Sequence, residues 1–475
     1  MKRKILFAAS EGNPYIATGG LGDVIGALPQ AIKKEDGSDV RVVMPYYSDV
    51  KAKYESELEY IGNIMVNLSW RSQYCGIFKG KKNGITFYFI DNEYYFDRRP
   101  CYGHFDDGER FAFFSKAVID LMGTIDFIPD VIHCHDWQTA LVPVYLRTLY
   151  CGDERYSKIK IVFTIHNIEY QGKFDMAILS DLFGLGGQEC GIVEYDGCIN
   201  LMKGAIECAD IVSTVSPSYA CEIFNPFYSH GLTPIIQKNC EKITGILNGI
   251  DTNFYNPDID KALFKTYNIN SIAGKYQNKK KMQEMLGLTV NVNTPVIAVI
   301  SRLVSHKGID IIAAATEEIL CRDVQFVVLG KGDEHYESYF RSVEDRYRGK
   351  MVAYIDYNPD VARKIYAGAD IFLMPSKSEP CGLAQMIASR YGTVPIVRET
   401  GGLKDSIHDC TLGEGNGFTF VDYTAHNVMN AVNRALSVYY NKKDWEKLVR
   451  AVMSVDFSWD VSAKKYVEMY ERLGS

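Results

Sequence analysis

The chain has 475 residues, of which 47% are hydrophobic and 23% are charged, as in ordinary globular enzymes. This length predicts two or three domains, each with enough apolar material for its own core. The net charge of −7 argues against nucleic acid as the main partner, because phosphate binding needs a basic face.

No stretch of the chain approaches the ~18 apolar residues of a membrane-spanning helix. The basic start, Lys2–Lys4, is followed by an apolar run that stops at Ser10, which is too short for the core of a signal peptide. The twelve cysteines are scattered singly, with no CxxC pair. We therefore expect a cytoplasmic protein with reduced thiols and no membrane partner.

Short apolar runs alternate with helical patterns, which indicates βα units and parallel sheets. In the first half, strands are expected at Ile5–Ala9, Val40–Met44, Thr86–Ile90, Val131–His133, Ile161–Ile165 and Ile211–Val215. In the second half, they are expected at Val296–Ile300, Gln325–Leu329, Met351–Tyr354, Ile371–Met374 and Val394–Val397. The fold class is thus α/β, with two Rossmann-like domains that face each other across a cleft.

The two sets of strands are separated by residues 242–293, which are rich in Asn, Lys and Asp and contain the turn signals Asn248-Gly249 and Asn256-Pro257. We expect an N-terminal domain over residues 1–245 and a second domain over residues 246–455. Residues 456–475 have the capping serine Ser458 and apolar positions at helical spacing, which predicts a terminal helix.

A glycine-rich segment, Thr18–Val24, follows the first predicted strand. Its glycines let a ligand approach the backbone, and the helix start that follows offers amides to a phosphate. The spacing is not G-x-G-x-x-G, and no acidic residue closes the second strand, so a nicotinamide-dependent dehydrogenase is weakly supported. A plain glycine-rich turn is the alternative interpretation.

Histidines end two further strands, in the segment His133–Trp137 and at His166. A zinc site would need further ligands at fixed spacing, and none follows. Polar residues at the tip of a buried strand more often bind substrate than metal, which favours a substrate site here. For His166 the alternative is a structural histidine with satisfied hydrogen bonds.

Two cations, Arg302 and Lys307, follow the strand Val296–Ile300. On one loop at the carboxyl edge of a sheet they fit a diphosphate, with the guanidinium making forked bonds and the ammonium acting as a point charge. A solvated charge pair is the alternative. The loop Gly330–Asp333 is a weaker candidate of the same kind.

The buried strand Ile371–Met374 is followed by one carboxylate, Glu379, and by a helical pattern that Gly382 and Leu383 open. The next strand leads to the glycine pair of Thr400–Leu403 at the same edge of the sheet. A carboxylate beside free amides suits a polyhydroxylated, anionic ligand, because the carboxylate accepts sugar hydroxyls and the amides take phosphate. A capped structural turn is the alternative.

Taken in order, these segments resemble one family: the bacterial glycogen synthases and plant starch synthases, which have the two-domain glycosyltransferase B fold. The matching segments cover essentially the whole chain. They are Thr18–Val24, His133–Trp137, Phe163–Asn167 with Tyr170–Gly172, Val215–Pro217, Leu247–Asp251, Ser301–Leu303 with Lys307–Gly308, Glu379–Leu383, Thr400–Leu403 and Asp456–Trp459. The resemblance implies transfer of glucose from ADP-glucose to the non-reducing end of an α-1,4-glucan (glycogen or a malto-oligosaccharide), with retention of the anomeric configuration.

The resemblance also implies roles for residues at matching positions. Glu379 would hold the donor glucose, and Arg302 and Lys307 would stabilise the departing diphosphate. His166 would lie beside the reacting sugar, and Asp136 would line the same pocket from the N-terminal side; with the three residues above, both are implied to be catalytic. No metal and no cofactor are implied, because ADP-glucose is a co-substrate. By the same resemblance, residues 1–245 bind the glucan, residues 246–455 bind the nucleotide sugar, and the terminal helix crosses back onto the N-terminal domain.

Further positions are implied to contact the donor, with Tyr357 where the family stacks an aromatic ring on adenine. They are Gly19, Gly20, Asp23, Asn248, Tyr357, Cys381, Gly382, Leu383, Thr400, Gly401 and Gly402. Eight residues after Glu379, many retaining enzymes of this fold have a second glutamate, where this chain has Ile387. The glycogen synthase group also lacks that acid, which disfavours sucrose-phosphate synthase and phosphorylase.

Four residues depart from the family pattern: Ala17 replaces a lysine, Ala140 a glycine, Ser378 an aromatic residue and Ala384 a hydroxyl residue. We expect all four to lie around the cleft and not in the core. The missing lysine would remove positive charge near the phosphates or the acceptor. It motivates an alternative function, a catalytically weak paralogue that binds glucan or nucleotide in a regulatory or scaffolding role.

Overall fold

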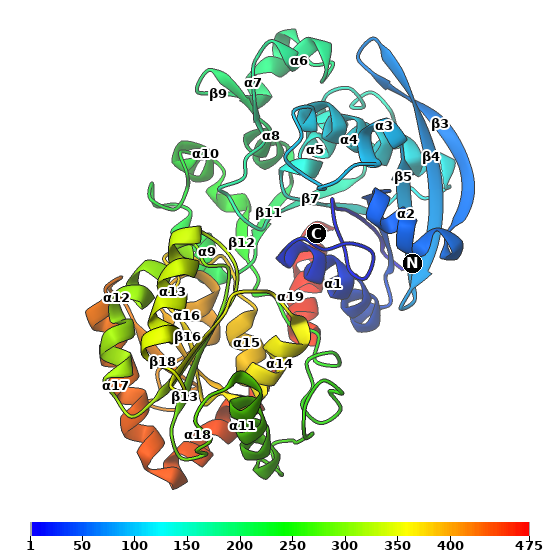
Figure 1. The fold of residues 1–475 in the computed structure, drawn as a ribbon. Helices are drawn as coiled ribbons and strands as arrows, with labels where there is room; N and C mark the ends of the chain where they lie inside the picture. The colour runs from blue at the N-terminus through cyan, green and yellow to red at the C-terminus, as the bar shows by residue number, and fades with distance from the viewer. Residues whose placement is uncertain (1, 475) are drawn as a thin grey trace. The chain divides into compact units, whose positions relative to one another are not determined.

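The computed structural model describes residues 2–474, which form two compact units (Figure 1). The N-terminal unit comprises the described residues up to Asn248 together with those from Trp459 onward, and the C-terminal unit comprises Gly249–Ser458. Within the described residues, no helix combines the length and the apolar character needed to cross a membrane.

The N-terminal unit contains a nine-stranded sheet in the order β12-β11-β7-β6-β1-β2-β5-β4-β3. The strands from β12 to β5 are parallel, whereas β4 and β3 are antiparallel to their neighbours. Their bounds are β1 (Lys4–Ala8), β2 (Asp39–Pro45), β3 (Glu59–Leu68), β4 (Arg71–Lys82), β5 (Ile85–Asp91), β6 (Val131–His135), β7 (Lys160–Ile165), β11 (Ile211–Thr214) and β12 (Ile243–Gly245). The six strands expected in this half are all present, with ends within two residues.

Helices and a small three-stranded sheet, in the order β8-β10-β9, complete the N-terminal unit. The helices are α1 (Gly20–Asp36), α2 (Ser48–Tyr54), α3 (Glu93–Phe96), α4 (Asp107–Thr124), α5 (Leu141–Arg147), α6 (Ile178–Asp181), α7 (Cys190–Val193), α8 (Leu201–Cys208), α9 (Pro217–Glu222) and α10 (Thr233–Lys238). The small sheet comprises β8 (Lys173–Phe174), β9 (Glu194–Tyr195) and β10 (Cys198–Asn200).

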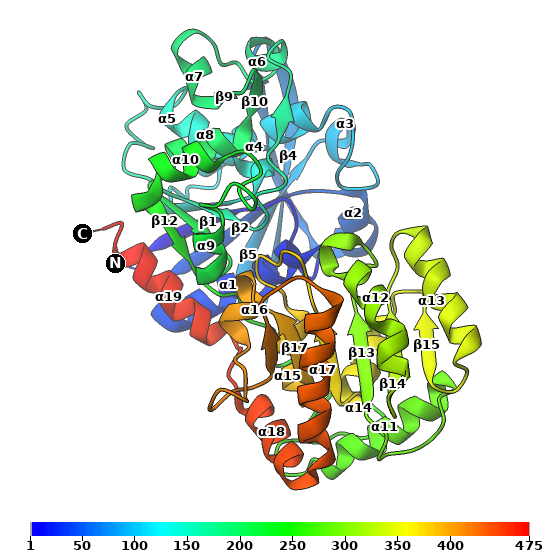
Figure 2. The ribbon, with the colours of Figure 1, turned by 90° about the vertical axis from the view of Figure 1, so that its left-hand side faces the viewer.

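The terminal helix α19 (Trp459–Glu471) packs along α1 within the N-terminal unit (Figure 2). Its predicted apolar stripe is the buried side, since Ala463, Tyr466 and Tyr470 are at most 1% exposed. The Tyr470 hydroxyl lies 2.7 Å from Nδ1 of His133 in the middle of β6. The last helix is therefore part of the core of the N-terminal unit.

The C-terminal unit contains a six-stranded parallel sheet in the order β15-β14-β13-β16-β17-β18. The strands are β13 (Val296–Ile300), β14 (Gln325–Leu329), β15 (Met351–Tyr354), β16 (Ile371–Met374), β17 (Val394–Arg398) and β18 (Phe418–Phe420). The first four have the bounds that the apolar runs predict, because strands buried on both faces read as continuous apolar segments.

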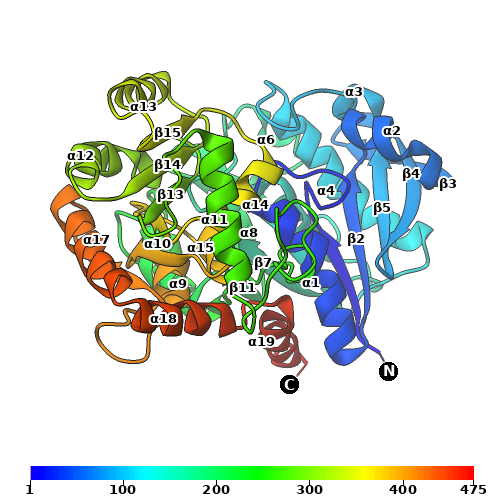
Figure 3. The ribbon, with the colours of Figure 1, turned by 60° about the horizontal axis from the view of Figure 1, so that its bottom comes forward.

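Helices cover both faces of this sheet (Figure 3). Helix α12 packs against α13 and α17, and α11 packs against α14. The bounds are α11 (Ala273–Leu286), α12 (Ile309–Leu320), α13 (Glu334–Arg346), α14 (Pro359–Gly368), α15 (Ala384–Arg390), α16 (Gly401–Ser406), α17 (Ala425–Tyr440) and α18 (Lys442–Ser454). The strand order reverses between β13 and β16, and open α/β sheets bind ligands beyond the carboxyl ends of the strands at such a point.

Candidate active site

An ion pair between a buried carboxylate and a half-buried ammonium lies at the switch point of the C-terminal sheet. Glu379 follows β16 and is 6% exposed, and Lys307 ends a turn after β13. The Lys307 Nζ lies 2.9 Å from Oε1 and 2.7 Å from Oε2 of Glu379. The Ser376 hydroxyl donates a third hydrogen bond of 3.0 Å to Oε2. Glu379 and Lys307, both predicted for this site, are thus in direct contact.

The glycine pair after β17 supports Glu379 from its backbone side. The amide of Gly402 lies 3.2 Å from the carbonyl oxygen of Glu379. A Cβ atom on Gly401 would lie 2.0 Å from that oxygen, and one on Gly402 would lie 2.2 Å from the Cys381 carbonyl oxygen. Gly401 also has a φ of +44°, which L side chains rarely adopt. Larger residues would therefore push the Glu379 loop out of place.

The helix after Glu379 begins later than the sequence pattern predicts. Gly382 and Leu383 were expected to open it, but α15 starts at Ala384. Gly382 has a φ of +72° and lies outside the right-handed helical region. The side-chain amide of Gln385 turns back to donate to the carbonyls of Cys381 (3.2 Å) and Gly382 (3.0 Å). These bonds hold the loop that carries Glu379.

Arg302 and Tyr357 lie at the same edge of the C-terminal sheet, beyond β13 and β15, but they project into solvent. Arg302 is exposed, and within residues 2–474 its guanidinium has no hydrogen-bond or ion-pair partner. Tyr357 is 68% exposed, next to Asp356, whose carboxylate lies 3.1 Å from the Lys331 ammonium. The structure brings Glu379, Lys307 and the glycine pair together, and it leaves these two side chains available to a ligand.

Asp136 has a strained backbone at the switch point of the N-terminal sheet. It follows β6 with φ 57° and ψ −180°, a region populated almost only by glycine that costs about 1–3 kcal/mol. Its Oδ1 accepts a 2.8 Å hydrogen bond from the His166 amide. Burial raises the pKa of Asp136 to about 7, although hydrogen bonds from the backbone amides of His166 and Asn167 act to lower it. Strain of this kind clusters at functional sites.

Three histidines lie in a row behind Asp136. Nε2 of His166 is 3.0 Å from Nδ1 of His135, and the rings of His135 and His133 stack with centroids 4.3 Å apart. Burial lowers the pKa of His166 to about 3 and that of the other two well below the ordinary value. All three are therefore neutral at physiological pH. His133 is a satisfied structural histidine, with the Tyr470 hydroxyl on one nitrogen and the Thr164 hydroxyl on the other.

Glu11 anchors the glycine loop and is a site residue that the sequence patterns did not reveal. It is 3% exposed, and its Oε2 accepts both the amide (2.7 Å) and the hydroxyl (2.5 Å) of Thr18. Its Oε1 accepts the Gly22 amide at 3.1 Å. Burial raises the pKa of this carboxyl. The signal available was an acidic residue directly after the first buried strand, at the switch point of the sheet.

The exposed edge of the loop has room for a ligand. Gly19 and Gly20 are exposed, and a Cβ atom on Gly20 would meet nothing within 4 Å. Gly22 differs, since a Cβ atom there would lie 2.3 Å from Cβ of the exposed Ala17. Asp23 accepts a 2.8 Å hydrogen bond from the Asn13 amide. Nothing in the fold requires glycine at Gly20, whereas close approach of a ligand would.

Asn248, a predicted donor contact, and the positions that depart from the family pattern differ in how deeply they are buried. Asn248 is 6% exposed, and its Oδ1 has no hydrogen-bond partner within the described residues. Ala140 precedes α5 and is fully buried, which corrects the expectation that all four departures from the family pattern lie outside the core. Ser378 and Ala384 are half-buried near Glu379.

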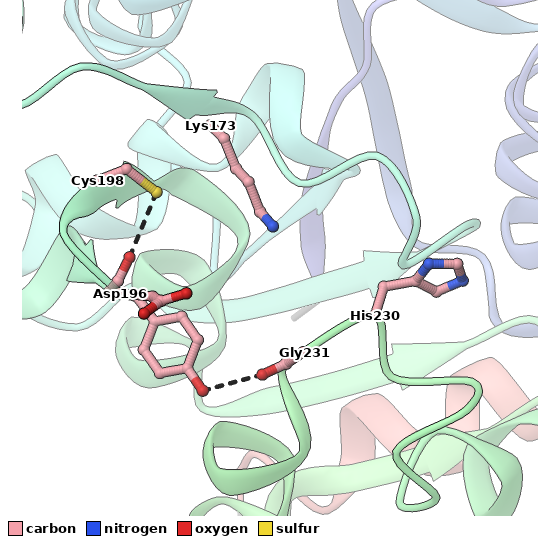
Figure 4. A pocket seen from close by; sticks show the side chains of 6 residues that line it. Lys173, Asp196, Cys198, His230 and Gly231 are labelled. Carbon is pink, nitrogen blue, oxygen red and sulfur yellow. Dashed lines mark hydrogen bonds between the residues drawn. The ribbon is translucent and has the colours of Figure 1, made fainter.

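A pocket of about 340 Å³ lies elsewhere in the N-terminal unit, over the small sheet (Figure 4). Its lining residues are Lys173, Tyr195, Asp196, Cys198, His230 and Gly231. The Tyr195 hydroxyl closes one side by donating to the Gly231 carbonyl at 2.9 Å. None of the predicted site residues lines this pocket. Across the part of the chain that the structure describes, no group of three or more His, Cys, Asp or Glu side chains is arranged to hold a metal ion.

Comparisons with known proteins give the class first. Residues 4–238 match the family model described as the starch synthase catalytic domain, and residues 280–451 match the model of glycosyl transferases group 1. The protein is a glycosyltransferase with parallel sheets in two α/β domains, and the fold class predicted from sequence is confirmed.

The chain belongs to the family of bacterial glycogen synthases and plant starch synthases. It is 46% identical to the glycogen synthase of Clostridium botulinum (strain Alaska E43 / Type E3), with 99% of each chain covered. It is 47% identical to that of Clostridium kluyveri, over 99% of this chain and 100% of the relative. The family resemblance drawn from the sequence motifs is therefore confirmed.

Two solved structures are similar over the whole chain. The catalytic domain of starch synthase IV from Arabidopsis thaliana, bound to ADP and acarbose, has a TM-score of 0.91 and 34% identity, over 100% of this chain and 99% of that one. Sucrose-phosphate synthase from Thermosynechococcus elongatus has a TM-score of 0.63 and 16% identity, over 99% of each chain. The second likeness extends to the fold alone.

Proposed function

We propose that this protein transfers glucose from ADP-glucose to the non-reducing end of an α-1,4-glucan, with retention of the anomeric configuration. The observation that carries the proposal is the Lys307–Glu379 pair at the switch point of the C-terminal sheet. Two comparisons support it: the curated relatives are glycogen synthases, and the similar starch synthase holds ADP and acarbose.

The pair has hydrogen-bonding capacity left for a donor. A carboxylate offers about four lone-pair sites, and Glu379 uses three of them, two for Lys307 and one for Ser376. The Lys307 ammonium has three N–H donors and directs two at Glu379. Glu379 would accept a hydroxyl of the donor glucose, and the third N–H of Lys307 would reach a phosphate oxygen.

The departing diphosphate would be stabilised by positioned positive charge. Arg302 is exposed at the same sheet edge, and its planar fork suits two phosphate oxygens. Together with Lys307 it would meet the negative charge that develops as the glycosidic bond to ADP breaks. Preorganised electrostatics of this kind is commonly the largest single contribution to such a transfer. Tyr357 would stack on adenine through its exposed ring.

The N-terminal unit would supply the acceptor side. Asp136 would accept a hydrogen bond from a sugar hydroxyl, and His166 would meet the sugar through Nδ1, because its Nε2 lies 3.0 Å from Nδ1 of His135. Gly20 leaves open space at the start of α1, where backbone amides favour a phosphate. We thus assign glucan binding to the N-terminal unit and most of the nucleotide-sugar binding to the C-terminal unit, with the glycine loop of the N-terminal unit adding a contact to the donor phosphate.

The test is incorporation of radiolabelled glucose from ADP-glucose into glycogen, followed by digestion of the product with β-amylase. We expect label in the polymer, and its release as maltose would show that the new linkages are α-1,4 and that configuration was retained. Label that enters the polymer but resists β-amylase would contradict the linkage. Absence of incorporation would contradict the transferase activity.

A second candidate is a binding paralogue with little catalysis, which Ala17 favours. Ala17 is exposed beside the glycine loop, where the family resemblance implies a lysine. An alanine offers no charge to a phosphate or acceptor at this position. Tight binding of glycogen or ADP-glucose without incorporation of label would support this candidate over the transferase.

A further inference from the structure

His135, the last residue of β6, packs in a buried cluster of three aromatic rings. Its own side chain is fully buried. Its ring stacks with that of Phe7 in β1, with centroids 5.3 Å apart, and with that of His133, with centroids 4.3 Å apart. The Phe7 and His133 rings are in turn 4.8 Å apart. Because protein interiors are close-packed, this cluster fixes the orientation of the His135 imidazole.

The two nitrogens of His135 have different surroundings. Nδ1 lies 3.0 Å from Nε2 of His166, whereas Nε2 is buried and has no hydrogen-bond partner within residues 2–474. Burial lowers the pKa of both histidines far enough to keep them neutral, and a neutral imidazole carries one N–H and one bare nitrogen. The proton of His135 therefore lies either in the bond to His166 or on the unpartnered Nε2.

Hydrogen-bond chemistry favours the first arrangement. A proton on Nε2 of His135 would be a buried N–H without an acceptor, and such orphaned donors are rare in folded proteins. A proton on Nδ1 is used in the 3.0 Å bond, and it leaves at Nε2 a bare lone pair, since acceptors are left unmatched more often than donors. His135 thus donates to Nε2 of His166, and the proton of His166 must then lie on its other nitrogen, Nδ1.

The Nδ1 atom of His166 is open to a ligand. His166 directly follows β7, and its ring is half-buried. Within the described residues its Nδ1 has no hydrogen-bond partner, and it is not among the fully enclosed polar atoms. The backbone that carries the ring is fixed as well, because the His166 amide donates to Oδ1 of Asp136 at 2.8 Å. An N–H on this nitrogen would be a donor of fixed direction.

We propose that His135 is a positioning residue that holds His166 as the Nδ1–H tautomer, so that His166 donates a hydrogen bond to a sugar oxygen. This inference rests on the proposed function, in which His166 meets the sugar. It has a chemical consequence: the nitrogen that faces the sugar carries a proton and has no lone pair, so His166 is not the base that removes the proton of the acceptor hydroxyl.

The tautomer is measured by nitrogen NMR of wild type labelled with ¹⁵N in its histidine rings, without substrate. Bare and protonated ring nitrogens give well-separated resonances, and the ring protons connect the two nitrogens of each histidine. The variants His166→Gln and His135→Asn assign the signals by their loss. We expect the proton on Nδ1 in both His135 and His166. A proton on Nε2 of His166 would overturn the proposal.

The role of His135 is tested with His135→Leu, which removes the donor at similar volume. The His166 signals should become an average of both tautomers. With glycogen as acceptor, kcat should fall about tenfold, less than the ~10²-fold typical of deleting a donor outright, and the KM for ADP-glucose should stay the same. Unchanged His166 signals in this variant would contradict the positioning role.

His135→Asn is the conservative variant, because its side-chain amide can place an N–H near the position of Nδ1. It should restore the Nδ1–H signature of His166 and most of kcat, and it keeps the test decisive if His135→Leu does not fold. Loss of activity in His135→Asn with the His166 tautomer preserved would reduce His135 to a packing residue. The matched control is His426→Leu, which removes an exposed imidazole from α17 of the C-terminal unit and should change neither readout.

The NMR measurement needs no turnover, so the two proposals fail separately. If wild type transfers no glucose but His166 carries its proton on Nδ1, the transferase proposal fails and the tautomer assignment stands. If wild type transfers glucose and His166 carries its proton on Nε2, the tautomer assignment fails and the transferase proposal stands.

Discussion

Two glycine pairs lie at the carboxyl edges of the two sheets, and glycine is needed at each for a different physical reason. Gly401 and Gly402 are buried against the Glu379 loop, and a Cβ atom on either would lie about 2 Å from a backbone oxygen. Gly19 and Gly20 are exposed; a Cβ atom on Gly20 would meet nothing within 4 Å, and one on Gly19 would make only an ordinary 3.8 Å contact with Glu11 Oε1. The first pair is required by packing, whereas the second is required only if a ligand comes close.

The polar groups differ in the same way between the two units. The C-terminal unit holds a carboxylate and an ammonium in contact, each compensating the charge of the other. The N-terminal unit holds neutral imidazoles and a strained Asp136, whose pKa burial raises to about 7. This contrast suits a division of labour, in which one unit handles a charged donor and the other a neutral sugar acceptor.

The largest effect is expected from Glu379→Ala. Loss of the carboxylate should reduce kcat/KM by ~10²-fold or more, because the group would hold the donor in the transition state. Steady-state kinetics with ADP-glucose and glycogen measure this, and circular dichroism with a thermal melt verifies that the variant stays folded. Near-normal activity would show that Glu379 is not in the donor site. The control Ser378→Ala alters the same loop without touching the pair.

Lys307→Ala should raise the barrier by about 3 kcal/mol, the scale of losing one stabiliser of developing charge. Lys307→Arg should restore activity only in part, since a planar fork and a point charge are not interchangeable. The comparison of kcat/KM among the three proteins decides this. Full rescue by arginine would mean that only net charge matters at this position.

The glycine pairs give a direct contrast in stability. Gly401→Ala should lower the free energy of unfolding by about 2 kcal/mol or more, through its positive φ and its contact with the Glu379 carbonyl. Gly20→Ala should leave stability unchanged or slightly higher, since alanine favours the helix that starts there, while the KM for ADP-glucose rises. Thermal melts and donor titrations measure the two effects. Equal destabilisation by both substitutions would refute the contrast.

The smallest effect is expected from Ala17→Lys. A new ammonium at ~4 Å from a phosphate or acceptor oxygen is worth up to about 4 kcal/mol before desolvation, at an effective dielectric near 20. We expect a rise in kcat/KM of at least severalfold with little change in melting temperature. A neutral or harmful lysine would indicate that the loop is built around alanine. If neither wild type nor the variant transfers glucose, the binding-paralogue interpretation gains support.

The sequence predicted the parallel strands well because their signal is local: a strand buried on both faces, such as Ile371–Met374, reads as an uninterrupted apolar run. The β3–β4 hairpin was missed because its buried residues alternate with exposed ones, and Tyr60 and Tyr74 on the exposed side obscure that pattern. The three-residue strand β18 (Phe418–Phe420) is too short for any periodic signal.

For the candidate site, the motifs identified the residues but not the contacts that hold them in place. The contact of Lys307 with Glu379 joins positions 72 residues apart and follows from adjacent strands β13 and β16, which sequence periodicity cannot pair. Glu11 was not predicted because its role is to accept hydrogen bonds from the backbone amides of Thr18 and Gly22, and these amides come close to it only in the folded protein. The strain at Asp136 has no sequence signal, because aspartate adopts positive φ in ordinary turns, as at Asp126 and Asp196, and its sequence does not reveal the ψ of −180° that makes this position unusual.

The most direct test of the central claim is a comparison of nucleotide-sugar donors by the wild-type protein, with glycogen as acceptor. Initial rates of glucose incorporation are measured over a range of ADP-glucose and UDP-glucose concentrations, with Glu379→Ala as the blank. The account predicts saturable incorporation from ADP-glucose, with a clearly higher kcat/KM than from UDP-glucose. Equal efficiency with both donors, or incorporation that persists in Glu379→Ala, would contradict it.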